Sequence, residues 1–198
     1  MCKVSDVPKL WTDTIEEHRQ QVRDAIVKAT AELIDERGLL SVTMSAIAER
    51  AGIGRATLYK YFRDVEAILL TWHEEKISGH LEQLARLAHR PGNPGERVTA
   101  VLDAYALMRH SSRGQHDTDL AAFLHRGHHL ASAERALHQL IRDLLDEAAH
   151  AGEVRDDIPP AELATYCLHA LNAAASADSA AAIHRLLALT CAAIQPPR

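Results

Sequence analysis

The chain has 198 residues and a formal net charge of −5, and 47% of its residues are hydrophobic whereas 4% are aromatic. This content is enough for a packed core, and the dominance of alanine and leucine over β-branched residues favours an all-α fold over a β-sandwich or barrel. The negative charge argues against a protein that coats nucleic acid without sequence preference, because such binding neutralises many phosphates at once.

The N-terminal segment predicts a flexible arm followed by one long helix. Residues 1–13 mix charges of both signs with Pro8 and show no helical periodicity. We expect the helix to begin at Thr14, because Thr14 and Glu17 have the spacing of a reciprocal capping box, and to end before Gly38. Apolar residues at intervals of three and four positions then predict one buried stripe. They are Val22, Ala25, Ile26, Ala29 and Leu33.

Residues 43–62 predict two short helices joined by a tight turn. Thr43 is a good N-cap for a helix over residues 44–51, and the glycines at positions 52 and 54 allow the backbone to turn sharply. A second short helix is expected over residues 55–61, with Leu58 and Phe62 facing the core. This pattern is typical of a helix-turn-helix unit, in which a partner helix holds a recognition helix against DNA.

The rest of the chain predicts a helical body. Asp64 is expected to cap a long helix that ends near Pro91, where the run Pro-Gly-Asn-Pro-Gly makes the clearest break in the sequence. Further helices are predicted near residues 96–109, 118–131, 133–151, 160–176 and 179–194. The expected organisation is therefore an arm over 1–13, a three-helix helix-turn-helix domain over 14–63, and a helical effector-binding and dimerisation domain over 64–198.

The segment that contains the predicted recognition helix is basic, although the chain as a whole is acidic. The stretch from residue 50 to residue 63 carries four cations and no acid, so it contributes +4 while the remainder sums to −9. Polar and cationic side chains on the outward face of the second short helix can bond phosphates and base edges, and the alanine at position 56 lets the backbone approach DNA closely. The outward set is Arg55, Ala56, Thr57, Tyr59, Lys60 and Tyr61.

The run TMSAIAERAGIGRATLYKYF over residues 43–62, followed by EAILL over residues 66–70, closely resembles the tetracycline-repressor (TetR) family. The resemblance covers about residues 20–72. It implies that Thr43 bonds a phosphate as it caps its helix. Thr57, Tyr59 and Tyr61 fall where this family touches phosphates or bases. Arg55 and Lys60 fall on the variable side that reads sequence.

Two positions depart from the family pattern. Gly54 stands where the family usually has Ser or Thr to cap the recognition helix, and Val65 stands where it often has a phosphate-binding Lys. Each departure removes an expected phosphate contact. Arg63 compensates for them in our interpretation, so it joins the predicted DNA-binding residues.

A single helix-turn-helix domain reads only half of an operator site, so we expect a homodimer on a pseudo-palindromic double-stranded operator. The apolar helices over residues 160–194 are the predicted dimer surface, which the resemblance also implies, although the same pattern fits the core of a monomer. The body is further expected to enclose an apolar small-molecule effector, with plain core packing as the alternative. The candidate lining residues are Trp72, Leu102, Tyr105, Met108, Phe123, Leu124, His128 and Leu144.

The sequence offers weaker support for other classes of function. A metal sensor could use His125, His128 and His129, and a redox sensor could use Cys167 and Cys191, but inert packing and a solvated helix face explain these residues more simply. A hydrolase lacks any supporting motif, so we expect no enzyme activity, cofactor or metal. A DNA-binding regulator that responds to no small molecule remains an alternative interpretation of the sequence. No signal-peptide or membrane-spanning pattern is found, which predicts a cytoplasmic protein without a membrane partner.

Overall fold

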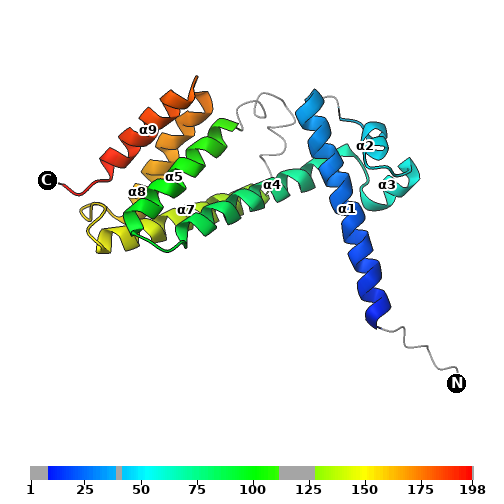
Figure 1. Ribbon diagram of the computed structural model, residues 1–198, viewed down its shortest axis with the longest axis horizontal. Coiled ribbons are helices and arrows are strands. Elements are labelled where there is room, and N and C mark those ends of the chain that lie inside the picture. The colour runs from blue at the N-terminus through cyan, green and yellow to red at the C-terminus, as the bar shows by residue number, and fades with distance from the viewer. Residues whose placement is uncertain (1–8, 39–41, 112–127, 198) are drawn as a thin grey trace. The chain divides into compact units, whose positions relative to one another are not determined.

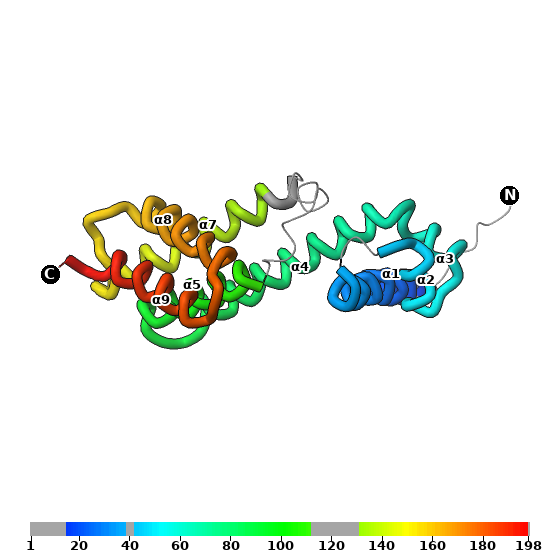
Figure 2. The backbone as a smooth tube through the Cα atoms, turned by 90° about the horizontal axis from the view of Figure 1, so that it is seen from above, coloured from blue at the N-terminus to red at the C-terminus, as the bar shows by residue number. Residues whose placement is uncertain are grey.

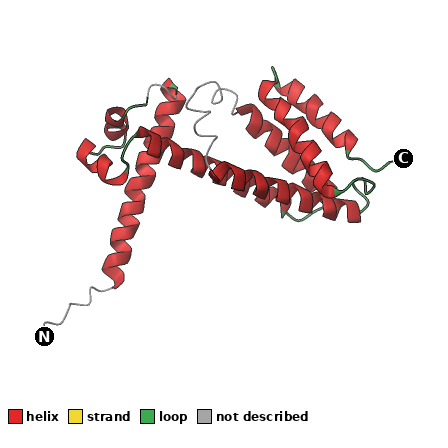
Figure 3. Cartoon of the chain, turned by 180° about the vertical axis from the view of Figure 1, so that it is seen from behind, coloured by secondary structure: helices red, strands yellow, loops and turns green. Residues whose placement is uncertain are grey.

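The computed structural model describes residues 9–38, 42–111 and 128–197, and within these ranges the chain is helical with no strand (Figures 1 and 3). The predicted all-α class is therefore confirmed. The chain forms two compact units, Met1–Glu75 and Lys76–Arg198. The division falls inside a long helix rather than between residues 63 and 64, because the first part of that helix contributes buried side chains to the N-terminal unit.

The N-terminal unit packs three helices and the start of a fourth around a small apolar core. The helices are α1 (Lys9–Arg37), α2 (Met44–Arg50), α3 (Arg55–Tyr61) and α4 (Val65–Ala88). Each helix supplies at least one side chain that is essentially inaccessible to solvent. These side chains are Ile26, Ile47, Leu58, Ile68 and Leu69. Short helices are unstable alone, so α2 and α3 depend on this shared core.

The first helix differs from its prediction at two points. It begins at Lys9, so residues 9–13 are helical and Thr14 lies inside the helix instead of capping it. The physical reason is that nothing between Pro8 and Thr14 breaks a helix. Ala25 is exposed rather than part of the buried stripe. Thr30 is buried in its place, and its hydroxyl donates a hydrogen bond of 2.9 Å to the carbonyl of Ile26.

The turn between α2 and α3 depends on one glycine in the left-handed region. Gly52 has a φ of +68°, and its amide bonds to the carbonyl of Glu49 at 3.2 Å. We expect Gly52→Ala to destabilise the chain by about 1 kcal/mol, because a Cβ is strained at that φ. Gly79→Ala is the matched control. Gly79 lies within α4 with open space around it, so alanine there should stabilise by about 1 kcal/mol.

Denaturant unfolding measures the free energy of unfolding of both glycine variants. This free energy should fall in Gly52→Ala and rise in Gly79→Ala. Equal effects of the two substitutions would contradict a conformational requirement for glycine at position 52.

The C-terminal unit is a bundle in which α5, α7, α8 and α9 lie side by side (Figures 1 and 2). Its elements after α4 are α5 (Pro94–Ser111), α7 (His128–His150), α8 (Pro160–Asn172), the 3-10 turn η2 (Ala173–Ser176) and α9 (Ala180–Ala193). The helix predicted over 118–131 falls largely outside the described residues. The helix predicted from residue 133 begins earlier, at His128.

One buried cation, Arg97 of α5, makes polar contacts with α4 and α7. Arg97 is 9% exposed; its Nη1 donates to the carbonyl of Ala88 at 2.9 Å, and its Nη2 forms an ion pair with Glu147. It thereby caps the C-terminal end of α4 and links α5 to α7. A buried guanidinium is tolerated here because it is paired.

Candidate DNA interface

The recognition helix α3 is held by two buried side chains and turns its polar side chains outward. Leu58 is fully buried and Phe62 is 4% exposed. Two backbone bonds start the helix, from the amides of Thr57 and Leu58 to the carbonyl of Gly54, at 2.9 and 3.0 Å. Of the seven predicted contact residues between positions 55 and 63, five are exposed and two are half-buried. Arg55, Ala56, Tyr59, Lys60 and Arg63 are exposed, and Thr57 and Tyr61 are half-buried.

The cations of this region differ in how they are paired. Within the described residues, Arg55 and Lys60 make no ion pair, whereas Arg63 lies 3.0 Å from the carboxylate of Asp64. That pair is exposed, so it holds Arg63 weakly. The +4 counted along the sequence therefore overstates the charge available on this face, and Arg55 and Lys60 are its unpaired cations.

The helix ends confirm two expected caps and one expected departure. The Thr43 hydroxyl accepts a hydrogen bond from the amide of Ala46 at 3.2 Å, so Thr43 caps α2. Gly54 precedes α3 without a side-chain cap. Asp64 caps α4, where its carboxylate accepts from the amide of Ala67 at 2.8 Å.

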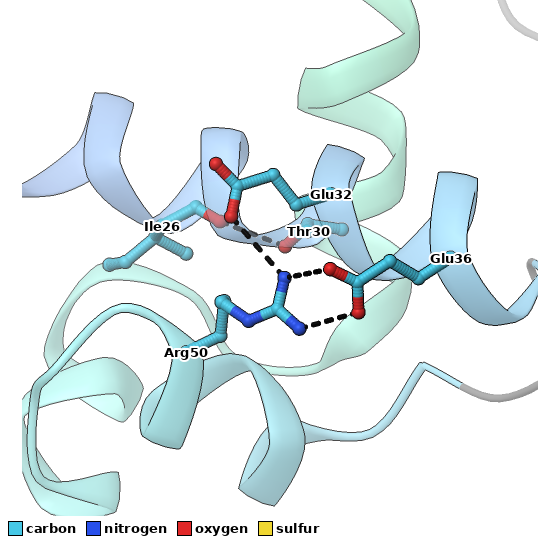
Figure 4. Close-up of polar contacts among 5 residues, drawn as sticks. All are labelled: Ile26, Thr30, Glu32, Glu36 and Arg50. Atoms are coloured by element: carbon cyan, nitrogen blue, oxygen red, sulfur yellow. Dashed lines mark hydrogen bonds and ion pairs between the residues drawn. The ribbon is translucent and has the colours of Figure 1, made fainter.

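Arg50, the last residue of α2, makes a forked ion pair with α1 (Figure 4). Its two terminal nitrogens lie 2.8 and 2.6 Å from the two carboxylate oxygens of Glu36, and one of them lies 3.3 Å from Glu32. The hydrogen bonds from Arg50 lower the pKa of Glu36, so that carboxylate is charged at neutral pH. Arg50 is one of the four cations of residues 50–63, and its pairing with α1 was not predicted from the sequence.

Arg23 of α1 is a second contact that the sequence did not indicate. Its guanidinium stacks over the Phe62 ring, 4.6 Å from the ring centre, and donates to the hydroxyl of Thr71 at 3.1 Å. A cation over an aromatic face is attracted by the ring's negative potential. Arg23 therefore connects the end of α3 to α4 within the N-terminal unit.

The predicted effector residues fall into different parts of the chain. Trp72 is buried in the N-terminal unit. Four others meet in the apolar core of the C-terminal unit: Leu102, Tyr105, Met108 and Leu144. The Tyr105 hydroxyl donates to Asn172 at 2.9 Å. Phe123 and Leu124 lie outside the described residues, and His128 begins α7 with a side chain that is not described.

A cavity of about 250 Å³ lies at the start of α5 and contains none of these predicted residues. Its walls come from α5, the segment after α7, and the end of α9. The lining residues are Gly95, Glu96, Val98, Thr99, Glu153, Val154, Cys191, Ile194 and Gln195. Leu102, Tyr105, Met108 and Leu144 lie in or against the apolar core, and none of them lines this cavity.

The three histidines considered for metal sensing lie outside the side chains that the structure describes. No group of three or more histidine, cysteine or carboxylate side chains in the described ranges could hold a metal ion. His125 lies outside those ranges, and the side chains of His128 and His129 are not described. Among residues 9–38, 42–111 and 128–197, no helix has the length and apolar content that a bilayer span requires.

Both thiols of the C-terminal unit have pKa values above the ordinary value for cysteine. Burial raises the pKa of Cys167 to about 12 and also raises the pKa of Cys191. Because the thiolate is the reactive form, we expect both thiols to react slowly with iodoacetamide at neutral pH in a Cys2→Ser variant. Mass spectrometry measures the labelling, and the unfolded chain gives the reference rate. Rapid labelling of either native thiol would restore the redox-sensor alternative.

A capped helix, a glycine turn and an anchored second helix with unpaired outward cations define a helix-turn-helix DNA-binding protein. The family model "Bacterial regulatory proteins, tetR family" matches residues 26–71, and the model "Transcriptional regulator SbtR-like, C-terminal domain" matches residues 93–196. The chain belongs to the TetR family of transcriptional regulators. It is a DNA-binding regulator and not an enzyme.

Curated relatives are similar over different parts of the chain. The fatty acid metabolism regulator protein of Bacillus subtilis is 21% identical over 140 residues, which cover 67% of this chain and 71% of that protein. The transcriptional regulator EthR of Mycobacterium tuberculosis is 36% identical over 72 residues, 36% of this chain and 33% of that protein.

Solved structures share the fold. A TetR/AcrR regulator from Thermobifida fusca superposes with a TM-score of 0.71 at 22% identity, covering 85% of this chain and 96% of that one. The regulator FadR of Bacillus subtilis, solved in complex with stearoyl-CoA, gives a TM-score of 0.60 at 18% identity and covers 89% of this chain and 100% of that one.

Proposed function

We propose that the chain is a dimeric, ligand-responsive repressor that leaves its operator when a small apolar effector binds the body. The observation that carries the proposal is the outward face of α3, where Arg55 and Lys60 are exposed without an ion pair in the described residues. Unpaired cations on an anchored helix suit phosphate and base-edge contacts. The proposed contacts are the eight predicted residues: Thr43, Arg55, Ala56, Thr57, Tyr59, Lys60, Tyr61 and Arg63.

The proposed dimer surface is the outer face of α8 and α9. Leu163, Leu171 and Ile183 are buried in the unit's own core, but Tyr166 is 45% exposed and Leu189 is 70% exposed. Large exposed apolar side chains on neighbouring helices favour association with a second copy. The dimer would bring two helix-turn-helix domains to the two halves of a pseudo-palindromic operator.

The proposed effector has a large apolar part, and a fatty acyl-CoA, whose apolar acyl chain is attached to a charged CoA group, is the first class to try. Two matches from Bacillus subtilis point there: a fatty acid metabolism regulator protein, and the regulator FadR solved in complex with stearoyl-CoA. The lining proposed for the site is the group of core residues at the middle of the C-terminal unit, Leu102, Tyr105, Met108 and Leu144. Repression by release requires that effector and operator weaken each other's binding reciprocally.

Recovery of the genomic DNA that the purified protein retains is the first experiment, because it supplies the operator. Operator affinity is then measured with and without stearoyl-CoA. Weaker operator binding and a raised melting temperature with the ligand support the proposal. If neither an acyl-CoA nor an apolar ligand changes the operator affinity, the result would favour a regulator without an effector.

The two kinds of contact can be separated by mutation. Lys60→Ala should weaken binding chiefly at one operator position, whereas Thr43→Ala should weaken it nearly equally on every sequence. Thr43→Ser is the control, because serine keeps both the hydroxyl and the helix cap. Unchanged operator affinity in both alanine variants would refute the proposed interface.

The dimer is tested with Leu189→Glu, which places a charge on the proposed apolar surface. The expected result is dissociation to monomers in analytical ultracentrifugation and loss of operator affinity. Leu107→Glu is the matched control, because Leu107 is also exposed, at 43%, but lies on α5 outside residues 160–194. Dissociation by the Leu107 variant alone would move the interface elsewhere.

A further inference from the structure

The forked pair between Arg50 and Glu36 lies at the point where the recognition unit turns. Arg50 is the last residue of α2, and the next four residues form the turn that leads into α3. The turn is fixed to α2 by backbone bonds, including one of 3.0 Å from the amide of Ile53 to the carbonyl of Ala48. Any shift of the end of α2 therefore carries the start of α3 with it.

The polar link between α1 and α2 rests on this one arginine. Within the described residues, every side-chain hydrogen bond between the two helices involves Arg50 (Figure 4). Its partners Glu36 and Glu32 stand four residues apart on α1, where like charges repel unless a cation lies between them. The guanidinium thus joins two helices and offsets a repulsion within one of them.

A bidentate pair adds something that the apolar core lacks. Ile47 and Leu58 are fully buried, but apolar contacts are not directional and permit small sliding movements. Two parallel hydrogen bonds between a guanidinium and a carboxylate fix a defined distance and angle. Contacts to base edges require placement within about 0.5 Å, so a small shift of α3 would matter for sequence reading.

We infer that Arg50 is a positioning residue for operator recognition: its fork on Glu36, with Glu32 beside it, sets the place of the α2–α3 turn and hence of the recognition helix. Arg50 acts through α3 and leaves phosphate binding to other cations. This inference rests on the proposed operator binding and extends it to residues outside the set of predicted contacts.

The inference predicts the opposite sign from simple electrostatics. Removing a carboxylate from a DNA-binding unit should by charge alone strengthen binding to the phosphate backbone. If Arg50 positions α3, loss of the Glu36 charge should instead weaken operator binding. Three single substitutions remove the same charge from residues with graded contact to Arg50. They are Glu36→Gln with two bonds, Glu32→Gln with one longer bond, and Glu49→Gln, an exposed neighbour with no ion pair in the described residues.

The experiment measures affinity for operator and for random duplex DNA at several salt concentrations. We expect Glu36→Gln to lose about fivefold in operator affinity, Glu32→Gln about twofold, and Glu49→Gln nothing. Affinity for random DNA should not fall, because a carboxylate and no phosphate contact is removed, and the slope of affinity against salt should stay at the wild-type value. A residue that served stability alone would lower the melting temperature without changing the ratio of operator to random binding.

Arg50→Lys completes the series because it keeps the charge but cannot make the fork. It should match the loss seen in Glu36→Gln. Tighter operator binding by Glu36→Gln, an equal response of all three glutamine variants, or wild-type affinity in Arg50→Lys would overturn the inference. Wild-type protein that binds no operator at all would instead refute the proposed function, so the two failures are distinguishable.

Discussion

Replacing Arg55 and Lys60 together with alanine should weaken operator binding by about two orders of magnitude or more. Each contact to a base edge or phosphate contributes about 1–3 kcal/mol, and these side chains are exposed cations without an ion pair in the described part of the chain. Their removal should leave the melting temperature unchanged. Fluorescence anisotropy at fixed salt measures the loss, and the salt slope should fall by about one for each phosphate contact removed.

A double variant elsewhere controls for the loss of two charges. Arg86 and Arg135 are exposed cations of the C-terminal unit, so Arg86→Ala with Arg135→Ala changes net charge equally. Its operator affinity should stay within about twofold of wild type, since distant exposed charges are screened at physiological salt. If the control double variant loses as much affinity as the Arg55 and Lys60 variant, general charge rather than α3 governs binding.

Leu58→Ala should destabilise the N-terminal unit by about 3 kcal/mol. Leu58 is fully buried, and truncation of such a side chain loses both its burial and the packing around the cavity that remains. The seven-residue helix α3 cannot persist without this anchor. Hydrogen exchange of the α2 and α3 amides, measured against those of α7, should show the loss locally, and operator binding should fall in parallel.

The neighbouring residue provides the control. Tyr59 follows Leu58 on the same helix but is 48% exposed, so Tyr59→Ala should change stability by no more than about 0.5 kcal/mol. It should nevertheless weaken operator binding, because it lies on the proposed contact face. Equal destabilisation by the two variants would mean that the burial pattern assigned to α3 is wrong.

The recognition unit was predictable because its signals are local. The glycine at position 52, the cap at Thr43 and the apolar spacing of Leu58 and Phe62 each act within a few residues, and all appear in the structure as expected. The all-α class followed equally from composition. Position 25 was assigned wrongly because a neighbouring stripe, which includes Thr30, fills the core instead.

Pairing between distant residues could not be read from the chain. Arg50 stands 14 residues from Glu36 and 18 from Glu32, so counting charge along the sequence placed it in a basic patch that the fold partly neutralises. The body presents a similar difficulty. An apolar stripe has the same periodicity whether it faces the unit's own core, a second copy or a ligand, and in α8 and α9 the structure divides such a stripe between buried Leu171 and exposed Leu189.

The position of Trp72 has a spectroscopic consequence. The chain has two tryptophans, at positions 11 and 72, and Trp72 is only 8% exposed within the N-terminal unit, whereas the C-terminal unit contains none. In a Trp11→Phe variant, tryptophan emission would therefore come from a single buried indole in the N-terminal unit. Under excitation selective for tryptophan, its wavelength would follow the unfolding of that unit without a contribution from the C-terminal unit.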